Sequence, residues 1–240
     1  MTAAEKQKLS CFLDLAGDYF SCGYKITQRD YRFEDDQSAL QAAPEITEND
    51  SGDSLEKIAR EIGVCANCYL AANRTNTVPG EGVTEPLVMV IGEGPGADED
   101  AQGRPFVGKA GQLLDKMLAS ISLSRNSNCF IANMVKCRPP GNRNPYPEET
   151  AACVHFLHRQ IKLLKPKFIL CAGNVSAQAM LNTTERVGKL HGTFTDIETG
   201  GLTIPLFVTY HPSALLHSAE YKRPAWEDLK RLRARLDGQS

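Results

Sequence analysis

Four short apolar runs alternate along this chain with stretches of helical periodicity, and this alternation constrains the fold more than any other feature. The apolar runs are residues 87–91, 129–135, 168–172 and 204–210, and the helical stretches are residues 108–120, 147–164, 176–181 and 224–236. Strands that alternate with helices form a mainly parallel sheet, and continuously apolar strands are buried on both faces. We therefore predict an α/β fold, a three-layer sandwich around a central, mainly parallel four-stranded sheet. Ligands should bind outside the carboxyl ends of its strands.

The chain is expected to hold one globular domain preceded by a leader. With 240 residues, 42% of them hydrophobic, it is long enough for one well-buried core. Residues 1–54 are predicted to be a partly disordered leader and acidic linker: a short helix fits residues 6–20, and polar residues interrupt any apolar period in residues 30–53. Ser54 is a candidate N-cap for a helix running toward Cys65. We place the domain at residues 55–240.

Charge is distributed unevenly between the two parts. The net charge is −2, but residues 1–60 hold 7 Lys and Arg against 12 Asp and Glu, and the rest of the chain holds 20 against 17. A solvated mixed-charge surface explains this small basic excess as readily as nucleic-acid binding does. No run approaches the roughly 18–20 apolar residues that cross a bilayer. We therefore expect a soluble, cytoplasmic protein with no membrane partner.

Four of the eight cysteines have the spacing of a metal site. Cys65 and Cys68 form a Cys-x2-Cys pair that is spaced to grip one metal centre, and Cys137 and Cys153 follow. Four thiolates suit zinc or an iron–sulfur cluster, and spacing alone leaves both open. The remaining cysteines are Cys129 and Cys171, expected as buried strand residues, and Cys11 and Cys22, which are assigned no role.

Chemically distinctive residues follow the predicted strands. Gly92-Glu93-Gly94-Pro95-Gly96 comes after the first strand, where glycines let backbone amides approach a planar or anionic ligand, unless the turn is purely structural. Asn133 ends the second strand, and its amide offers a donor and an acceptor to a base edge. His211 follows the last strand, so its imidazole reaches the same edge of the sheet. Phe106 precedes a helix, as either a core residue or a stacking platform.

In their order, these motifs resemble those of family 4 uracil-DNA glycosylases, from about residue 55 to residue 236. The matching segments are Cys65-Ala-Asn-Cys68, Gly92-Glu-Gly-Pro-Gly96 with Glu99-Asp100, Gly103-Arg-Pro-Phe-Val-Gly108, Asn133-Met-Val-Lys-Cys-Arg-Pro-Pro-Gly-Asn-Arg143 and His211-Pro-Ser213. Several independent motifs make the resemblance specific. It implies the uracil-glycosylase fold, a [4Fe-4S] cluster on Cys65, Cys68, Cys137 and Cys153, and release of uracil from single- and double-stranded DNA.

The resemblance also implies how uracil is read and released. Glycosylases take the target nucleotide out of the stack, and Phe106 would stack on the extruded base. Asn133 would accept from uracil N3–H and donate to O4, a pattern that cytosine reverses. His211 would donate to O2 as negative charge grows on the departing base. The substrate-binding set is then Glu93, Gly94, Phe106, Asn133, Asn142 and His211.

A carboxylate near the sugar would stabilise the developing cation or orient the attacking water. Glu93 and Glu99 are the two candidates, and sequence does not rank them. Other uracil-glycosylase families place an Asp at the position of Gly94, so their usual base is missing here. No lysine stands at a recognised nucleophile position, so the product should be an intact abasic site.

The cluster would have a structural role, ordering the basic loop between its ligands so that the loop tracks DNA phosphates. The implied DNA contacts are Lys136, Arg138, Arg143, Ser213 and Leu215, with Leu215 and Leu216 as candidate wedges for the vacated stack. A covalent uracil-binding relative has an added loop with a reactive histidine. Residues 143–149 contain no histidine, so we expect turnover.

Two other function classes fit parts of the pattern. An iron–sulfur redox protein would explain the cysteines, and it would show a reversible potential without base release. A DNA-binding module with structural zinc would bind without forming product. A monomer is expected. Sequence leaves open a sliding-clamp partner and the excision of hypoxanthine, xanthine or mismatched thymine.

Overall fold

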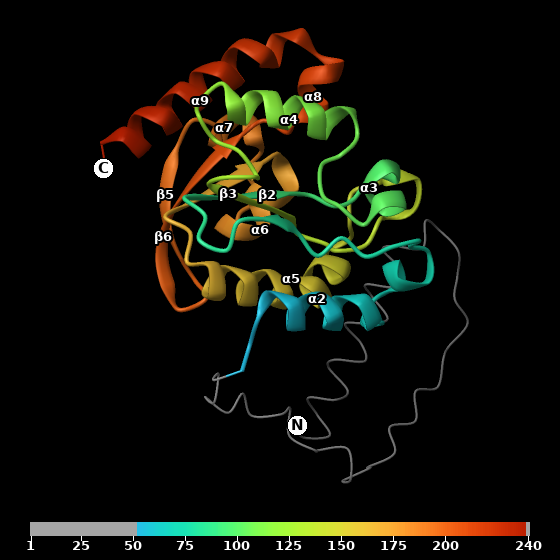
Figure 1. Ribbon diagram of the computed structural model, residues 1–240. Helices are drawn as coiled ribbons and strands as arrows, with labels where there is room; N and C mark the ends of the chain where they lie inside the picture. The colour runs from blue at the N-terminus through green and yellow to red at the C-terminus, as the bar shows by residue number, and fades with distance from the viewer. Residues whose placement is uncertain (1–51, 239–240) are drawn as a thin grey trace, which may run out of the picture. The chain divides into compact units, whose positions relative to one another are not determined.

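The computed structural model describes residues 52–238 (Figure 1). The chain divides into two units, Met1–Asn49 and Asp50–Ser240, of which the second contains all the described residues. The helix expected within residues 6–20, Cys11, Cys22 and nearly all of the acidic linker lie outside the described residues. Within residues 52–238, no helix has the length and apolar character that crossing a membrane requires.

A six-stranded sheet forms the centre of the domain. Its strands are β1 (Glu81–Gly82), β2 (Val88–Gly92), β3 (Cys129–Asn133), β4 (Phe168–Ala172), β5 (Phe194–Thr199) and β6 (Leu202–Thr209), in the order β1-β3-β2-β4-β6-β5. The four central strands are parallel, and β1 and β5 pair antiparallel at the two edges. The four predicted strands are therefore confirmed, but the predicted strand number was wrong. Neither edge strand carries an apolar run, because β1 has two residues and β5 is largely exposed.

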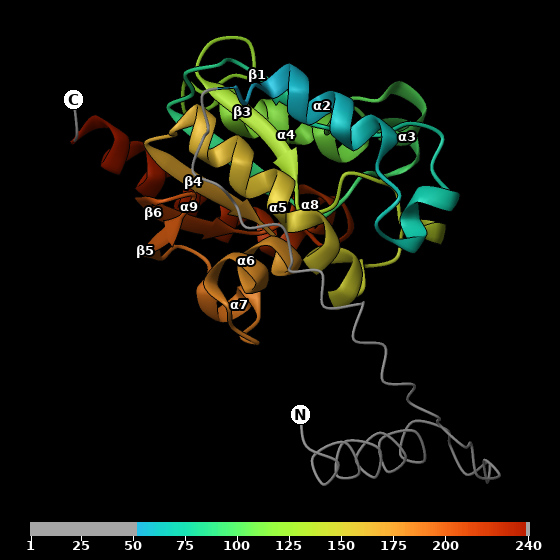
Figure 2. The same ribbon diagram turned by 90° about the horizontal axis from the view of Figure 1, so that it is seen from below.

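Helices cover both faces of the sheet, which confirms the three-layer α/β architecture. Their bounds are α2 (Leu55–Val64), α3 (Ala97–Gln102), α4 (Lys109–Ala119), α5 (Pro147–Leu164), α6 (Asn174–Leu181), α7 (Val187–Leu190), α8 (Pro212–His217) and α9 (Lys222–Asp237), with short 3-10 turns at Tyr69–Ala72, Pro140–Asn142 and Ala219–Tyr221. Helices α4, α8 and α9 lie on one side, and α2 and α5 lie on the other (Figures 1 and 2).

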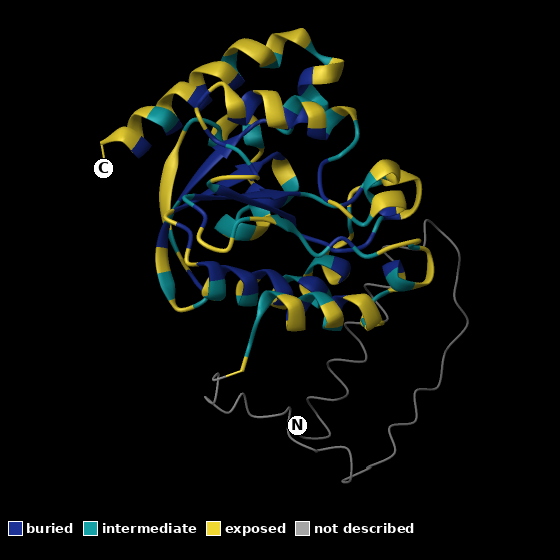
Figure 3. Ribbon diagram, viewed as in Figure 1, coloured by how far each residue is buried: buried dark blue, intermediate teal, exposed yellow. Residues whose placement is uncertain are grey.

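The strands separate two apolar cores by the alternation of their side chains. Val88 and Val90 of β2 pack with α4, α8 and α9, whereas Met89 and Ile91 pack with α5 and α6. Each of the strands β2, β3 and β4 has five residues, and all of them are buried (Figure 3). Because β2, β3 and β4 are buried along their whole length, they can present functional groups to solvent only at their ends.

Helix α2 docks on α5 through a third apolar cluster and an ion-pair network. The hydroxyl of Ser54 accepts from the amide of Lys57, which confirms the predicted N-cap. The guanidinium of Arg159 on α5 donates to both Asp53 and Glu61. This docking brings the segment that follows α2, with Cys65 and Cys68, against the α5 residue Cys153.

Candidate active site

A cavity of about 430 Å³ opens at the carboxyl ends of the parallel strands, where ligand binding was predicted. Gly92 ends β2, Asn133 ends β3, and His211 follows β6. Residues between 93 and 144, together with Ser213 and His217, form the remaining walls. Of the predicted site residues, the cavity is lined by Glu93, Gly94, Glu99, Phe106, Asn133, Asn142, Arg143, His211 and Ser213.

Asn133 presents a buried acceptor that has no donor. Its side chain is 2% exposed, and its Oδ1 has no hydrogen-bond partner among the described residues. An unpaired buried polar atom costs about 1–3 kcal/mol, so an unpaired acceptor on a cavity wall is a candidate contact for a ligand that supplies the donor. A Cβ at Gly92 would lie 2.5 Å from this oxygen and 2.4 Å from the Phe106 ring, so only glycine fits beneath the two side chains.

Phe106 adopts a conformation that is uncommon for a residue with a side chain. Its φ is +52°, in the left-handed region, and it is 6% exposed. Gly111 of α4 packs so closely against its backbone that a Cβ there would lie 2.0 Å from the Phe106 carbonyl oxygen. The ring lies on the cavity wall, with its centroid 5.6 Å from that of His211.

His211 is held as a neutral hydrogen-bond donor. It forms the N-cap of α8, where its Nδ1 accepts from the backbone N–H of Ser213 at 3.2 Å and lies 2.7 Å from the Ser213 hydroxyl. Burial lowers the pKa of His211 to about 4, against a weaker opposing effect of the Glu99 charge. A neutral ring that accepts at Nδ1 carries its proton on Nε2. The imidazole can therefore donate without being charged.

The two candidate carboxylates are in different environments. Glu99 accepts at one oxygen from the amides of Val107 and Gly108, at 2.8 and 2.9 Å, and at the other from Gly96 at 3.0 Å. The carboxylate of Glu93 has no hydrogen bond or ion pair within residues 52–238, and burial raises its pKa. Glu99 therefore joins the loop before α3 to the loop before α4. Glu93 is the carboxylate that is available to a substrate or a water.

Four cysteines line a second, smaller pocket between α2, α5 and the loop after β3. They are Cys65, Cys68, Cys137 and Cys153. Arg74 donates to the sulfur of Cys137 at 3.1 Å, and the backbone N–H of Lys136 donates to that of Cys153 at 3.3 Å. In the described part of the chain, no three His, Cys, Asp or Glu side chains are grouped to hold a single metal ion. Cys129 and Cys171 are buried strand residues, as predicted.

The family model of the uracil DNA glycosylase superfamily matches residues 79–230, which include the whole cavity. The chain belongs to the uracil-DNA glycosylase superfamily.

Curated members of the superfamily cover most of the chain. A type-4 uracil-DNA glycosylase of Pyrobaculum aerophilum is 42% identical over 179 residues, 73% of this chain and 91% of the relative. The type-4 enzyme of Archaeoglobus fulgidus is 39% identical over 184 residues, 75% and 92% of the two chains. The type-4 enzyme of Thermotoga maritima is 40% identical over 183 residues, which cover 75% of this chain and 93% of the relative. These matches confirm the resemblance to family 4.

Two predicted DNA contacts of this glycosylase-family chain are wrong. Lys136 is 1% exposed, and its ammonium donates to the Asn133 carbonyl at 3.0 Å and to Gln160 at 2.9 Å. It points inward because the strand β3 continues into a segment that packs against Cys153. Leu215 is 4% exposed in the core beneath α8, whereas its neighbour Leu216 is 48% exposed. Of the two candidate wedges, only Leu216 faces solvent.

The rest of the basic loop lies at the rim of the cavity in a fixed arrangement. Arg143 makes a bidentate pair with Glu149, at 2.8 and 2.7 Å, and its guanidinium lies 3.7 Å from the centroid of the Tyr146 ring. Arg138 donates to the side-chain oxygen of Asn142 at 2.7 Å. Both cations are thus oriented before any ligand binds.

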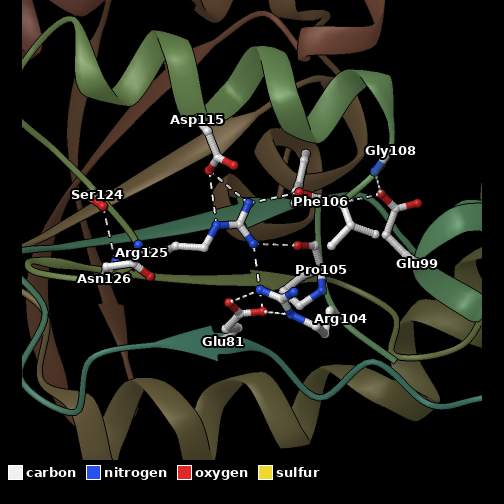
Figure 4. Close-up of polar contacts among 11 residues, drawn as sticks. Glu81, Glu99, Arg104, Pro105, Phe106, Gly108, Asp115, Ser124, Arg125 and Asn126 are labelled. Atoms are coloured by element: carbon white, nitrogen blue, oxygen red, sulfur yellow. Dashed lines mark hydrogen bonds and ion pairs between the residues drawn. The ribbon is translucent and has the colours of Figure 1, made fainter. Parts of the chain in front are cut away.

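Two further residues hold the loops of this site together: Arg125, which the sequence motifs did not single out, and Asp100, which belongs to a matched motif. The guanidinium of Arg125 donates to the backbone at Phe106 and is itself bound by Asp115 (Figure 4). The buried carboxylate of Asp100 accepts from the amides of Thr75 and Asn76. Sequence gave no distinguishing signal for Arg125, because a single arginine in a turn is ordinarily a surface residue.

Proposed function

We propose that the protein is a monofunctional uracil-DNA glycosylase, which hydrolyses the N-glycosidic bond of deoxyuridine in DNA, releases uracil and leaves an abasic site for base-excision repair. Membership of the superfamily and the similarity to type-4 enzymes support this function. The single observation that carries it is the unpartnered Oδ1 of Asn133 in a cavity shared with Phe106 and His211.

The unpartnered acceptor favours uracil over cytosine. With Oδ1 of Asn133 acting as the acceptor, uracil N3–H would supply the missing donor, and the amide nitrogen can donate to O4. Cytosine presents an acceptor at N3 and an amino group at C4, so both contacts would be lost. Each unmet buried group costs about 1–3 kcal/mol, which accounts for much of the expected selectivity.

His211 would stabilise the departing base. As the glycosidic bond breaks, negative charge grows on uracil and positive charge grows on the deoxyribose. A neutral Nε2–H donates to uracil O2 more strongly as that charge develops, so the contact stabilises the transition state more than the bound substrate. The hydrogen bonds of Nδ1 with Ser213 keep the ring in this tautomer.

Glu93 is the carboxylate that we assign to the sugar side of the reaction. It lines the cavity, and neither of its oxygens is occupied by a protein donor among the described residues. It can orient an attacking water or stabilise the oxocarbenium-like sugar. Glu99 is assigned to the loop structure instead, because both of its oxygens already accept from backbone amides.

A lyase reaction through a Schiff base is not part of the proposal. Among residues 52–238, no lysine lines the cavity, and the ammonium of Lys136 is buried and hydrogen-bonded to two acceptors. A Schiff base needs an accessible, unprotonated amine. The product is therefore an intact abasic site, with no strand cleavage by the enzyme.

We assign a [4Fe-4S] cluster to Cys65, Cys68, Cys137 and Cys153. The four thiols line one pocket, and four cysteine thiolates are the donor set that such a cluster would take. When bound, the cluster would cross-link the chain and supply no electrons to the hydrolysis. The four ligands would tie the end of α2 and the start of α5 to the loop that carries Arg138 and Arg143.

The DNA would lie across the rim of the cavity, in single- or double-stranded form. Arg138, Arg143 and Ser213 would contact phosphates, since Arg143 and Ser213 line the cavity and Arg138 donates to Asn142 on its wall. The exposed Leu216 would enter the gap left by the extruded nucleotide. One chain supplies every proposed residue, so a monomer suffices. We place the reaction in the cytoplasm, where reducing conditions keep cysteine thiols free for a cluster.

Base release from matched oligonucleotides tests the proposal. Two strands that differ only in uracil or cytosine at one position are incubated with the enzyme, and the free base is measured by chromatography. Uracil release with no cytosine release supports the assignment. Release of neither base by folded, brown protein would favour a redox or binding role.

A further inference from the structure

The peptide at Phe106 is held in a conformation that the chain would not adopt by itself. A residue with a side chain at φ +52° is destabilised by roughly 1–3 kcal/mol, and it persists only where its surroundings determine it. The ring of Phe106 lies on the cavity wall, so the conformation of this one peptide sets the position of the proposed stacking surface.

Arg125 contacts this peptide directly (Figure 4). Its Nη1 donates to the carbonyl of Pro105 at 2.8 Å and its Nη2 to the carbonyl of Phe106 at 2.8 Å. The planar guanidinium therefore joins two successive carbonyls, which a flexible point charge would not do as well. Arg125 is 8% exposed and does not line the cavity, so it does not reach a bound base.

The guanidinium is itself oriented by two carboxylates. Asp115 on α4 accepts from Nε at 3.0 Å and from Nη2 at 2.9 Å, and Glu81 of β1 lies 3.8 Å from Nη1. Glu81 is also bound in a bidentate pair by the exposed Arg104. Arg125 thus connects an edge strand and a helix to the loop that carries Phe106.

The loop is held equally firmly on its other side. The two amides that follow Phe106, those of Val107 and Gly108, donate to Glu99. The carbonyls of this short loop therefore face a fixed cation, and its amides face a fixed carboxylate. A change in Arg125 releases one side of the loop while Glu99 continues to hold the other.

We propose that Arg125 is a positioning residue, which holds Phe106 in its left-handed conformation so that the ring lies ready to stack on uracil beside His211. The inference deepens the proposed function and rests on it. Arg125 would act through Phe106 alone, with Asp115 and Glu81 orienting its guanidinium.

Inhibition by free uracil tests this role, because the free base meets the base-binding cavity without contacts to phosphate or sugar. The inhibition constant of uracil is measured for the wild type, Arg125→Gln, Arg125→Lys and Phe106→Leu in the cluster-containing protein. A misplaced stacking ring should raise the constant about ten-fold or more in Arg125→Gln. Arg125→Lys should raise the constant less than Arg125→Gln but still above the wild-type value, because a single ammonium cannot replace the two guanidinium N–H groups that donate to successive carbonyls.

A double-mutant cycle separates positioning from general stability. If Arg125 acts through Phe106, Arg125→Gln should raise the constant much less in the Phe106→Leu background than in the wild type. Arg104→Gln is the matched control, since Arg104 shares Glu81 but donates to neither loop carbonyl, and it should leave the constant unchanged. Asp115→Asn loosens the same guanidinium and replaces Arg125→Gln if that variant does not fold.

The outcomes distinguish this inference from the proposed function. A wild-type inhibition constant in a folded Arg125→Gln or Asp115→Asn protein would overturn the positioning role and leave the glycosylase activity intact. The positioning role would also be overturned if Arg125→Gln raised the inhibition constant by the same factor in the wild-type and Phe106→Leu backgrounds. A wild-type protein that does not release uracil would overturn the proposed function itself.

Discussion

The rings of Phe106 and His211 lie with their centroids 5.6 Å apart and their planes tilted by 35°. Phe106 comes from the loop before α4, and His211 comes from the end of β6, so two distant segments meet at one wall of the cavity. In the proposed function, a base that stacks on Phe106 would have its edge toward His211. Recognition of the base and its departure would then depend on neighbouring side chains.

His211→Ala should lower the rate of base release much more than it weakens DNA binding. The proposed hydrogen bond strengthens only as charge develops on uracil, and losing one such donor costs about 10²–10³ in rate. Single-turnover rates at saturating enzyme, with DNA dissociation constants measured separately, check this. An unchanged single-turnover rate would remove His211 from the mechanism.

Protonation of His211 should not limit activity near neutral pH. Because burial lowers its pKa to about 4, the ring stays neutral above that pH, and the rate should show no step near 6.5 that arises from this group. The pH–rate profile of the wild type, compared with that of His211→Ala, checks this. A step near 6.5 that disappears in the variant would contradict the neutral-donor role.

Asn133→Ala should abolish activity without a matching loss of stability. The substitution removes the amide that reads uracil, and it also removes a buried oxygen that has no partner in the free protein. Loss of an unsatisfied acceptor offsets part of the cost of the cavity, about 1–3 kcal/mol. Thermal unfolding and uracil release are measured on the same preparation. A large fall in Tm would show that Asn133 is mainly structural.

Glu93→Gln and Glu99→Gln should separate chemistry from loop structure. Glu93→Gln should slow base release with little change in Tm, because its carboxylate has no protein partner among the described residues. Glu99→Gln should lower Tm, because it weakens three backbone contacts. Comparable rates in the wild type and Glu93→Gln would exclude a role for Glu93 in the chemistry.

The rate should also fall on the acid side at a pH set by Glu93. Burial raises its pKa above the ordinary value of 4.5, so the carboxylate form is lost sooner as the pH falls. The acid limb of the wild-type profile should therefore lie above 4.5 and be absent in Glu93→Gln. An acid limb that persists unchanged in Glu93→Gln belongs to another group.

Cys137→Ser should remove the brown colour and the iron and sulfide content of the purified protein. Cys171→Ala is the control, because Cys171 is fully buried within β4, away from the pocket that the other four cysteines line. It should keep both iron and colour. Zinc in place of iron and sulfide in the wild type would contradict the cluster assignment.

The arrangement of the central strands and of the cavity follows closely from sequence patterns. The apolar runs predicted both ends of β4, and the strand-end rule predicted that Asn133 and His211 lie at one edge of the sheet, where both line the cavity. Ser54 as an N-cap was likewise readable, because its side-chain contact is local. Apolar periodicity predicts where strands and helices lie, and the type of a single residue predicts a local contact such as an N-cap.

What sequence did not predict depends on contacts between distant residues. Lys136 belongs to a basic stretch, yet it turns inward to Gln160, which lies 24 positions away. Arg125 reaches Phe106 across 19 positions, and Glu81 lies on a two-residue strand that shows no apolar pattern. Partners of this kind, distant in sequence, determine where the side chain of a loop residue points. A short sequence motif does not contain that information.

Alkali-dependent cleavage of a labelled oligonucleotide tests the central claim most directly. The substrate carries one uracil, opposite guanine or in a single strand, and the products are separated with and without alkali after incubation with the cluster-containing enzyme. We predict full-length product without alkali and cleavage at the uracil position after alkali, as an intact abasic site requires. Intact strands after alkali, on both substrates, would contradict the glycosylase function.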